Sequence, residues 1–203
     1  GTSLALDGTD RLLIGGRSKT APYATAWLFA RSGDTWLEQA KLQPQNSTFL
    51  STIAASVTLS GDMAILGDSL SDTQSSVFNK PGRIVVFRRS PSDGTWKQVQ
   101  TIQGERDDEL GAAMAFDSTT LISGAPGREG GRGKLVLFEL VGQSWSKVSE
   151  LGLVASDDSY VASGFASSIH VEGDLAVVGA PTARTYLPSV PDRGAAYVFK
   201  RGP

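Results

Sequence analysis

The sequence predicts an all-β fold: a β-propeller built of four-stranded antiparallel blades, present as a partial array of four repeats. The first observation behind this prediction is a glycine that ends an apolar run four times, with spacings of 52, 57 and 55 residues. A self-similar period of this size indicates a repeat architecture. The second is that each repeat divides into strand-length segments separated by turn residues, which is typical of an antiparallel meander. The glycines are Gly15, Gly67, Gly124 and Gly179.

The first segment of each repeat consists largely of small residues, and a short turn joins it to the second segment. Alanine, serine and glycine suit a place where backbones converge, so we expect these segments nearest the propeller axis. Pairs of aspartate and glycine tolerate the positive φ that two-residue hairpins demand. The small-residue runs are 1–4, 53–57, 110–114 and 165–169, and the turns are Asp7-Gly8, Gly61-Asp62, Asp117-Ser118 and Gly173-Asp174.

The third and fourth segments differ in the burial that they predict. The third is apolar at consecutive positions, as at Ile84 to Phe87, which indicates that both of its faces are covered. The fourth is polar between apolar ends, and a charged outer strand suits an exposed sheet edge. Three fourth segments carry a Trp six residues before an aliphatic residue, and a period of two makes both members point the same way. These pairs are Trp36 with Leu42, Trp96 with Ile102, and Trp145 with Leu151.

Small inner strands, buried middle strands and polar outer strands, repeated around an axis, describe the blades of a propeller. The alternative is a β-sandwich, which the number of strands alone would allow. The long-period self-similarity favours the propeller.

The order of these motifs resembles the FG-GAP repeats of integrin-α-type propellers, in the bacterial-style variant that has a short turn after the first segment. The resemblance covers nearly all 203 residues. It implies a propeller fold and an extracellular or cell-surface location. It specifies function poorly, because such repeats serve adhesion, scaffolding and enzyme-associated domains alike. The best copy consists of Phe165 to Ile169, Gly173-Asp174, Val178 to Pro181 and Gly194 to Phe199.

We expect a single propeller domain or segment whose repeats span roughly residues 1–49, 50–109, 110–163 and 164–203. The last repeat lacks its outer strand, and an unfinished blade leaves an open sheet edge. Three interpretations follow: a fragment of a larger propeller of about six to eight blades, a compact four-bladed ring, or a ring closed by another chain. We favour the first.

Composition excludes few classes of protein. With 40% apolar residues the chain can bury a sizeable core, and the balance of 19 basic against 21 acidic residues gives no sign of a nucleic-acid partner. No apolar run approaches the about 18 residues of a membrane span. The absence of cysteine removes disulfides and thiolate metal sites.

The connectors between the second and third segments vary most among the repeats. We expect them to cluster on one rim of the propeller, where loops on a rigid scaffold are suited to recognition. Tyrosine and arginine are favoured at interface hot spots. The alternative is that these are solvated loops of no special use. The candidate partner-binding residues are Tyr23, Phe78, Arg128, Arg132, Tyr186 and Arg193.

No metal or cofactor site is predicted. Calcium-type integrin repeats place several acidic residues at alternating positions after the first segment, whereas here that connection is a two-residue turn with Asp7 and Asp10 nearby. The acidic runs Asp107 to Glu109 and Asp157-Asp158 are interpreted as solvated loop charge, with a weak surface cation site as the alternative.

No catalytic signature is present either. His170 is the only histidine, and it alternates with polar residues, which favours a structural or surface role. The run from Ser90 to Trp96 resembles the Asp-box hairpin of sialidases with a spacing that departs by one residue, and such hairpins are structural. Asn46 begins a glycosylation sequon that matters only in a secreted eukaryotic protein.

The sequence thus yields two main functional hypotheses. The first is a non-enzymatic extracellular propeller segment that binds a protein or glycan partner, or assembles with other copies or chains, through its rim loops. The second is a propeller domain accessory to a hydrolase whose active site lies elsewhere in the full-length chain. A purely architectural role in a filament or oligomer is a third.

Overall fold

The computed structural model describes residues 2–17, 24–45, 54–70, 80–117, 119–153, 163–183 and 194–201, and within them the fold is all-β apart from one short turn of helix. The strands are β1 (Ser3–Asp7), β2 (Arg11–Arg17), β3 (Ala24–Ser32), β4 (Thr35–Leu42), β5 (Ser56–Ser60), β6 (Met63–Asp68), β7 (Arg83–Arg89), β8 (Trp96–Gln103), β9 (Met114–Phe116), β10 (Thr120–Ala125), β11 (Lys134–Val141), β12 (Ser144–Gly152), β13 (Ser168–Glu172), β14 (Leu175–Ala180) and β15 (Ala195–Lys200).

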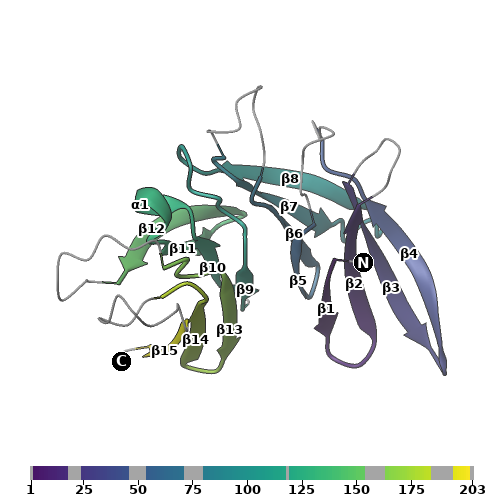
Figure 1. Cartoon of the computed structure of the whole chain (residues 1–203). Coiled ribbons are helices and arrows are strands. Elements are labelled where there is room, and N and C mark those ends of the chain that lie inside the picture. The colour runs from purple at the N-terminus through teal and green to yellow at the C-terminus, as the bar shows by residue number, and fades with distance from the viewer. Residues whose placement is uncertain are drawn as a thin grey trace.

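These strands form four antiparallel meanders, and the predicted β-propeller is confirmed (Figure 1). Blade 1 is β1-β2-β3-β4, blade 2 is β5-β6-β7-β8, and blade 3 is β9-β10-β11-β12. Blade 4 is β13-β14-β15, with three strands among the described residues. The short element α1 (Arg128–Gly131) lies between β10 and β11, and positive φ values at Glu129 and Gly130 make it a single irregular turn.

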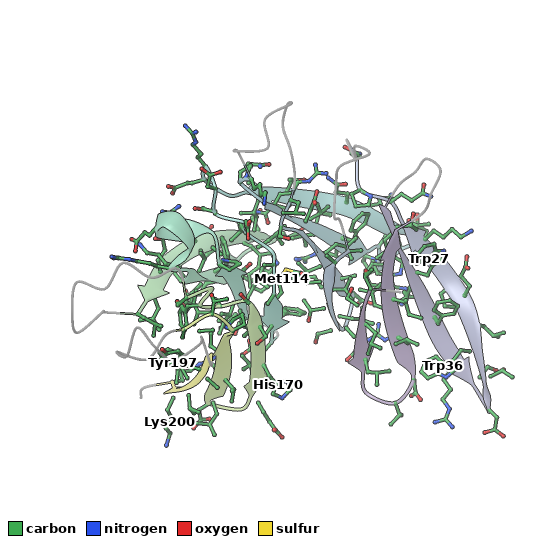
Figure 2. All side chains as sticks on the ribbon, viewed as in Figure 1. Trp27, Trp36, Met114, His170, Tyr197 and Lys200 are labelled. Atoms are coloured by element: carbon green, nitrogen blue, oxygen red, sulfur yellow. The ribbon has the colours of Figure 1, made fainter. Side chains whose placement is uncertain are left out.

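The first strands of the blades lie at the centre of the arrangement, as their small residues predict. Substantial contacts join β1 to β5, β5 to β9, and β9 to β13, so each first strand packs on that of the next blade. Figure 2 shows Met114 of β9 near the middle of the molecule and Trp36 of β4 toward its periphery.

Successive blades meet through a close approach of one backbone to another. A Cβ atom placed on Gly15, Gly67 or Gly124 would overlap the carbonyl oxygen of a residue in the next blade, so only glycine fits there. That carbonyl belongs to Ala54, Gly111 or Ala166, whose φ values are 66°, 88° and 70°. A positive φ strains alanine, which indicates that the contact holds these residues in place.

Serine hydroxyls strengthen two of these three junctions. Ser3 Oγ donates a hydrogen bond of 2.6 Å to the carbonyl oxygen of Ala54, and Ser56 Oγ donates one of the same length to that of Gly111. In blade 3 the equivalent residue is Ala113, which has no donor. The small residues of the first segments therefore serve both the close packing and the bonding of neighbouring blades.

Each inner blade buries both of its faces, which explains the consecutive apolar residues of the third segments. One face of blade 2 packs on blade 1 through Leu66, Val85 and Phe87, and the opposite face packs on blade 3 through Ile65 and Val86. The four residues Ile84 to Phe87 are accordingly all buried, as predicted.

The two end blades each leave one face without a neighbour among the described residues. On blade 1 this face includes Leu4 and Leu6, whose exposed fractions are 68% and 57%. On blade 4 it includes Val198, which is 67% exposed, together with Ser168 and His170. The sequence pattern that buries an inner blade therefore leaves apolar surface open at both ends of the array.

The prediction that the Trp and the aliphatic residue of each outer strand point the same way is wrong. Trp96 packs on the core shared with blade 1, whereas Ile102 packs on the core shared with blade 3. A β-bulge causes the reversal: β8 carries one unpaired residue, Val99, between the partners of Val86 and Phe87. The extra residue shifts the alternation of faces, which the simple period of two cannot reveal. Bulges at equivalent places interrupt the pairing of β4 with β3 and of β12 with β11.

A tight aromatic group anchors blade 4 to blade 3. Phe165, which is fully buried, meets the ring of Tyr197 edge-on at 5.5 Å and that of Phe199 at 6.0 Å. Leu135 of blade 3 belongs to the same buried cluster. Packing between blades thus explains Phe165, Tyr197 and Phe199.

The junction glycines allow a direct test of the close backbone approach. Gly124→Ala should lower the free energy of unfolding by about 3 kcal/mol, because the new methyl group must displace the backbone of Ala166. Urea denaturation followed by circular dichroism measures this loss.

Gly179→Ala is the matched control for that measurement. Gly179 occupies the same strand position in blade 4, where a Cβ would meet only the side chain of Ser168. Because that hydroxyl can rotate away, we expect stability close to that of the wild type. Equal losses in the two variants would contradict the interpretation.

Candidate binding surfaces

On one rim of the propeller, backbone hydrogen bonds join the connectors between blades to the connectors between the second and third strands. Residues 80–82 precede β7, and they receive hydrogen bonds from the connector that leads from blade 2 to blade 3. Glu109 N donates to Lys80 O at 2.9 Å, and Gly104 N donates to Gly82 O at 3.0 Å. One blade further on, Gly164 N donates to Gly131 O at 2.9 Å. The rim is therefore a continuous hydrogen-bonded layer across blades 2, 3 and 4.

Of the six candidate partner-binding residues, two lie on the described part of this rim. These are Arg128, the first residue of the turn α1, and Arg132, which directly follows it. Arg132 lies close to the connector that leads to blade 4, because its carbonyl oxygen accepts hydrogen bonds from Ser163 Oγ at 2.7 Å and from Phe165 N at 3.2 Å. The other four fall outside the described residues and remain predictions: Tyr23, Phe78, Tyr186 and Arg193.

Arg128 is engaged within the protein. Its Nη1 lies 2.7 and 2.8 Å from the two carboxylate oxygens of Asp108, and 2.8 Å from Glu105 Oε2. The side chain of Arg128 is 18% exposed and that of Asp108 is 6% exposed. The hydrogen bond to Asp108 is the largest cause that raises the pKa of Arg128, so the guanidinium stays charged at every accessible pH. This pair ties the connector of blade 2 to that of blade 3.

The interpretation of Asp107 to Glu109 as solvated loop charge is wrong for Asp108. Besides Arg128, its carboxylate accepts a hydrogen bond of 2.8 Å from the backbone nitrogen of Glu105. The partner guanidinium comes from a different blade, and no local pattern in the sequence connects the two. The other acidic run, Asp157-Asp158, falls outside the described residues.

Further charges extend the ion pair over the rim of blade 3. Glu150 Oε1 lies 2.9 Å from Lys147 Nζ and 3.5 Å from Arg128 Nη2, and Lys134 Nζ lies 2.6 Å from Glu129 Oε1. The hydrogen bond from Lys147, and then the charge of Arg128, hold the pKa of Glu150 below its ordinary value. The same hydrogen bond raises the pKa of Lys147. Lys134 Nζ also lies 3.6 Å from Glu150 Oε2, so six charged groups, namely Asp108, Glu105, Glu150, Lys147, Lys134 and Glu129, form one connected network around Arg128.

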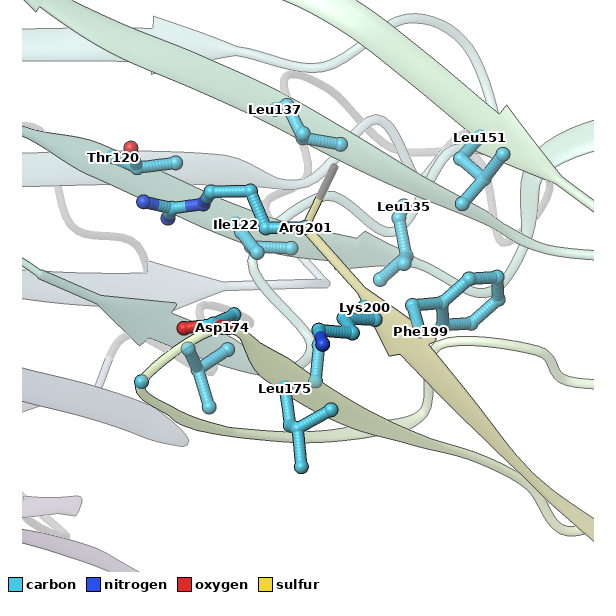
Figure 3. Close-up of a pocket in the computed structure, with 13 residues that line it drawn as sticks. Thr120, Ile122, Leu135, Leu137, Leu151, Asp174, Leu175, Phe199, Lys200 and Arg201 are labelled. Atoms are coloured by element: carbon cyan, nitrogen blue, oxygen red, sulfur yellow. The ribbon is translucent and has the colours of Figure 1, made fainter. Parts of the chain in front are cut away.

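A cavity of about 230 Å³ lies between blades 3 and 4 (Figure 3). Its walls are mostly apolar and include Ile122, Leu137 and Phe199, whereas Lys200 and Arg201 border it. β15 forms one side of the cavity, and among the described residues only β14 pairs with this strand. The cavity therefore adjoins the edge of β15 that has no paired strand among the described residues.

Two other residues singled out in the sequence, Asp7 and His170, make contacts within the protein or lie exposed on its surface. Asp7 bonds to Arg11 and accepts a hydrogen bond of 3.0 Å from Gly61 N, so its carboxylate links blades 1 and 2. His170 is exposed on the polar face of β13, as the alternation predicts (Figure 2). Within the described ranges, no group of three or more histidine, cysteine or acidic side chains is placed to hold a metal ion.

The hairpin from Ser90 to Trp96 is held together by Asp93. Its Oδ1 accepts hydrogen bonds from Thr95 N at 3.0 Å and from Thr95 Oγ1 at 2.8 Å. Hydrogen bonds from Ser90 and Thr95 lower the pKa of Asp93 to about 2, so the carboxylate remains an acceptor at ordinary pH. Asp93 thus organises a turn, in agreement with the structural role expected of such a hairpin.

Comparison with known proteins adds no further assignment. No family model matches the chain, and no curated protein matches it significantly. Among the described residues, no helix has the length and apolar character needed to cross a membrane.

Removal of the Arg128 charge should destabilise the protein. Arg128→Met leaves Asp108 buried without its counter-charge, and we expect the free energy of unfolding to fall by about 3 kcal/mol. Urea denaturation at neutral pH measures the change. Arg106→Met is the control, because the exposed pair of Arg106 with Asp107 contributes little. A loss no larger than that of the control would show that the network does not hold the rim.

The rim network also predicts a dependence of stability on pH. Because folding lowers the pKa of Glu150, its stabilising effect is complete above its ordinary pKa of 4.5 and is lost as the pH falls through the lower folded value. The difference in unfolding free energy between wild type and Glu150→Gln should therefore shrink as the pH is lowered from 7 toward 3. Chemical denaturation across this range measures it. Glu139→Gln, an exposed change outside the network, should give no such trend.

Proposed function

We propose that the chain is a non-enzymatic propeller segment of the FG-GAP type, which acts outside the cell or on its surface by binding a protein or glycan partner through its rim loops. The observation that supports the proposal is the rim on which backbone hydrogen bonds join the connectors of blades 2, 3 and 4. Such a layer provides a rigid base for the variable loops between second and third strands, and binding residues concentrate on loops that a rigid scaffold positions.

The FG-GAP assignment is supported by the packing of the motif residues. Ala125 and Ala180, which follow the junction glycines of blades 3 and 4, are fully buried. Phe165 fills the space between these blades beside Tyr197 and Phe199. Residue types that resemble the family motif thus occupy positions where blade packing demands them.

Arg132 and the aromatic residues of the rim loops are the best candidates to contact a partner. Arg128 contributes in another way, because its guanidinium is bonded to Asp108 and Glu105 and so supports the platform. In this proposal Arg128 stabilises the surface, whereas the other predicted residues contact the partner.

Substitution of the rim aromatic residues tests this proposal. The triple variant Tyr23→Ser, Phe78→Ser and Tyr186→Ser should lose at least about tenfold in affinity for any ligand that the wild type binds on a printed glycan array or a panel of purified secreted glycoproteins. Trp36→Ser is the matched control, since Trp36 is a partly exposed aromatic residue that follows the turn between β3 and β4 on the opposite rim.

Two results would overturn the proposal. One is a loss of binding in Trp36→Ser with no loss in the triple variant, which would move recognition to the other rim. The other is turnover of chromogenic glycosides or esters by the isolated chain that a single substitution abolishes, because this would make the chain an enzyme.

A further inference from the structure

The outer strand of blade 3 forms a sheet edge that does not lie at either end of the array. Among the described residues β12 pairs only with β11, and blade 3 packs between blades 2 and 4. The first strands of the blades lie at the centre, so the edge of β12 lies at the periphery. Unpaired backbone groups on such an edge are a template for pairing with another chain.

Trp145, the second residue of β12, directs its backbone N–H and C=O toward this edge. It lies opposite Leu140 in the pairing of β12 with β11. Leu140 N donates to Thr119 O at 3.0 Å, on the other side of β11. Opposite residues of an antiparallel pair exchange both of their hydrogen bonds or neither. The two backbone groups of Trp145 therefore face outward, where an added strand would pair with them.

The side chain of Gln100, which belongs to the outer strand of blade 2, binds both of these groups. Its Oε1 accepts a hydrogen bond from Trp145 N, and its Nε2 donates one to Trp145 O, each at 2.8 Å. A side-chain amide offers the same donor and acceptor as the backbone of a neighbouring strand. Gln100 thus makes the hydrogen bonds that a fifth strand would otherwise make with Trp145.

The position of Gln100 recurs in the other complete blades, but its chemistry does not. Gln100, Ala40 and Ser149 each follow the bulge of their outer strand and lie opposite equivalent residues of the third strand. The side chain of alanine has no polar group, and that of serine is shorter and ends in a single hydroxyl. Of these three residues, only the glutamine can bind an N–H and a C=O of the next blade at once. The repeat itself therefore does not account for a glutamine at this position.

Other features protect the remainder of the edge. Val148 is the unpaired residue of the bulge in β12, and Lys147 and Glu150 place charges on the same strand. Bulges and charged side chains both hinder pairing between edges. All three residues follow Trp145 in the strand, so the beginning of the edge depends on Gln100.

We propose that Gln100 is an edge cap, which prevents a second copy of the chain from adding a strand to β12 at Trp145. The cap acts by occupying the backbone donor and acceptor with which that strand would pair. It joins the outer strands of two blades, so it forms only when blades 2 and 3 are docked. This role goes beyond the proposed function and does not rest on it, because the residues lie on outer strands and not in the rim loops.

Gln100→Met tests the cap, because methionine has a similar length and no amide. The indole of Trp145 keeps its contacts with Met63 and Phe116, so the variant should remain folded. Two backbone groups become available on the edge, and we expect the dissociation constant for self-association to fall at least about tenfold below that of the wild type. Sedimentation velocity over a series of protein concentrations measures this change.

Gln98→Met is the matched control, with the same substitution in the same strand. Gln98 Oε1 accepts from Gln45 N at 2.9 Å, and its Nε2 donates to Thr101 Oγ1 at 3.0 Å. Gln45 lies outside the strands, so the loss of these bonds frees no backbone group of a sheet edge. The control should associate no more than the wild type does. Circular dichroism melting curves show whether each variant is folded.

Amide hydrogen exchange of the wild type tests the cap without any substitution. The amide of Trp145 should exchange much more slowly than that of an unstructured peptide, because it is bonded to Gln100. Exchange at the rate of an unstructured peptide would show that the cap does not form and would overturn the proposal, whether or not a variant folds.

Two further outcomes would overturn the proposal. One is a folded Gln100→Met variant that sediments as the wild type does, since the freed edge would then have no effect. The other is equal association of Gln100→Met and Gln98→Met, which would assign the association to a general loss of hydrogen bonds. Neither result bears on the rim loops, so the rim proposal would stand.

Discussion

The architecture depends on one contact, in which a carbonyl oxygen of each blade lies against a strand glycine of the blade before it. The contact recurs at Gly15, Gly67 and Gly124, and at each place a side chain on the glycine would collide with the backbone opposite. The facing residue has a positive φ even where it is alanine, as at Ala54 and Ala166. Such strain persists only where surrounding packing holds it, and here the buried clusters between blades supply that packing.

This contact explains why so much of the fold is predictable from the sequence. A glycine that cannot be replaced must recur at the spacing of the blades, and the small residues that face it must recur with it, so both leave a visible period. The complete burial of Ile84 to Phe87 follows from the stacking of blades, because a blade that lies between two others has no solvent-exposed face. The glycine and the small residues are close together in the sequence and recur in all four repeats, so they can be recognised without a structure.

Other features depend on residues that are distant in the sequence, so local patterns do not predict them. The bulge at Val99 leaves no mark in the spacing of Trp96 and Ile102, yet it turns these residues toward different neighbours. Asp108 resembles any loop acid until the fold brings Arg128 to it from the next blade. The cavity beside β15 likewise arises from the packing of blade 3 against blade 4 and has no local signal in the sequence. For the rim aromatic residues, the prediction rests on sequence alone.

The unlike surfaces at the two ends of the array have a consequence for any association between copies. Leu4 and Leu6 belong to the kind of face that in inner blades receives the preceding blade, whereas Ser168 and Gly179 belong to the kind that meets the following blade. A contact between two copies with the same geometry as the interface between blades would join the exposed face of blade 1 to the exposed face of blade 4. It would not join two identical faces. Growth by that route has a polarity, so it generates cyclic or helical assemblies and excludes a two-fold symmetric dimer.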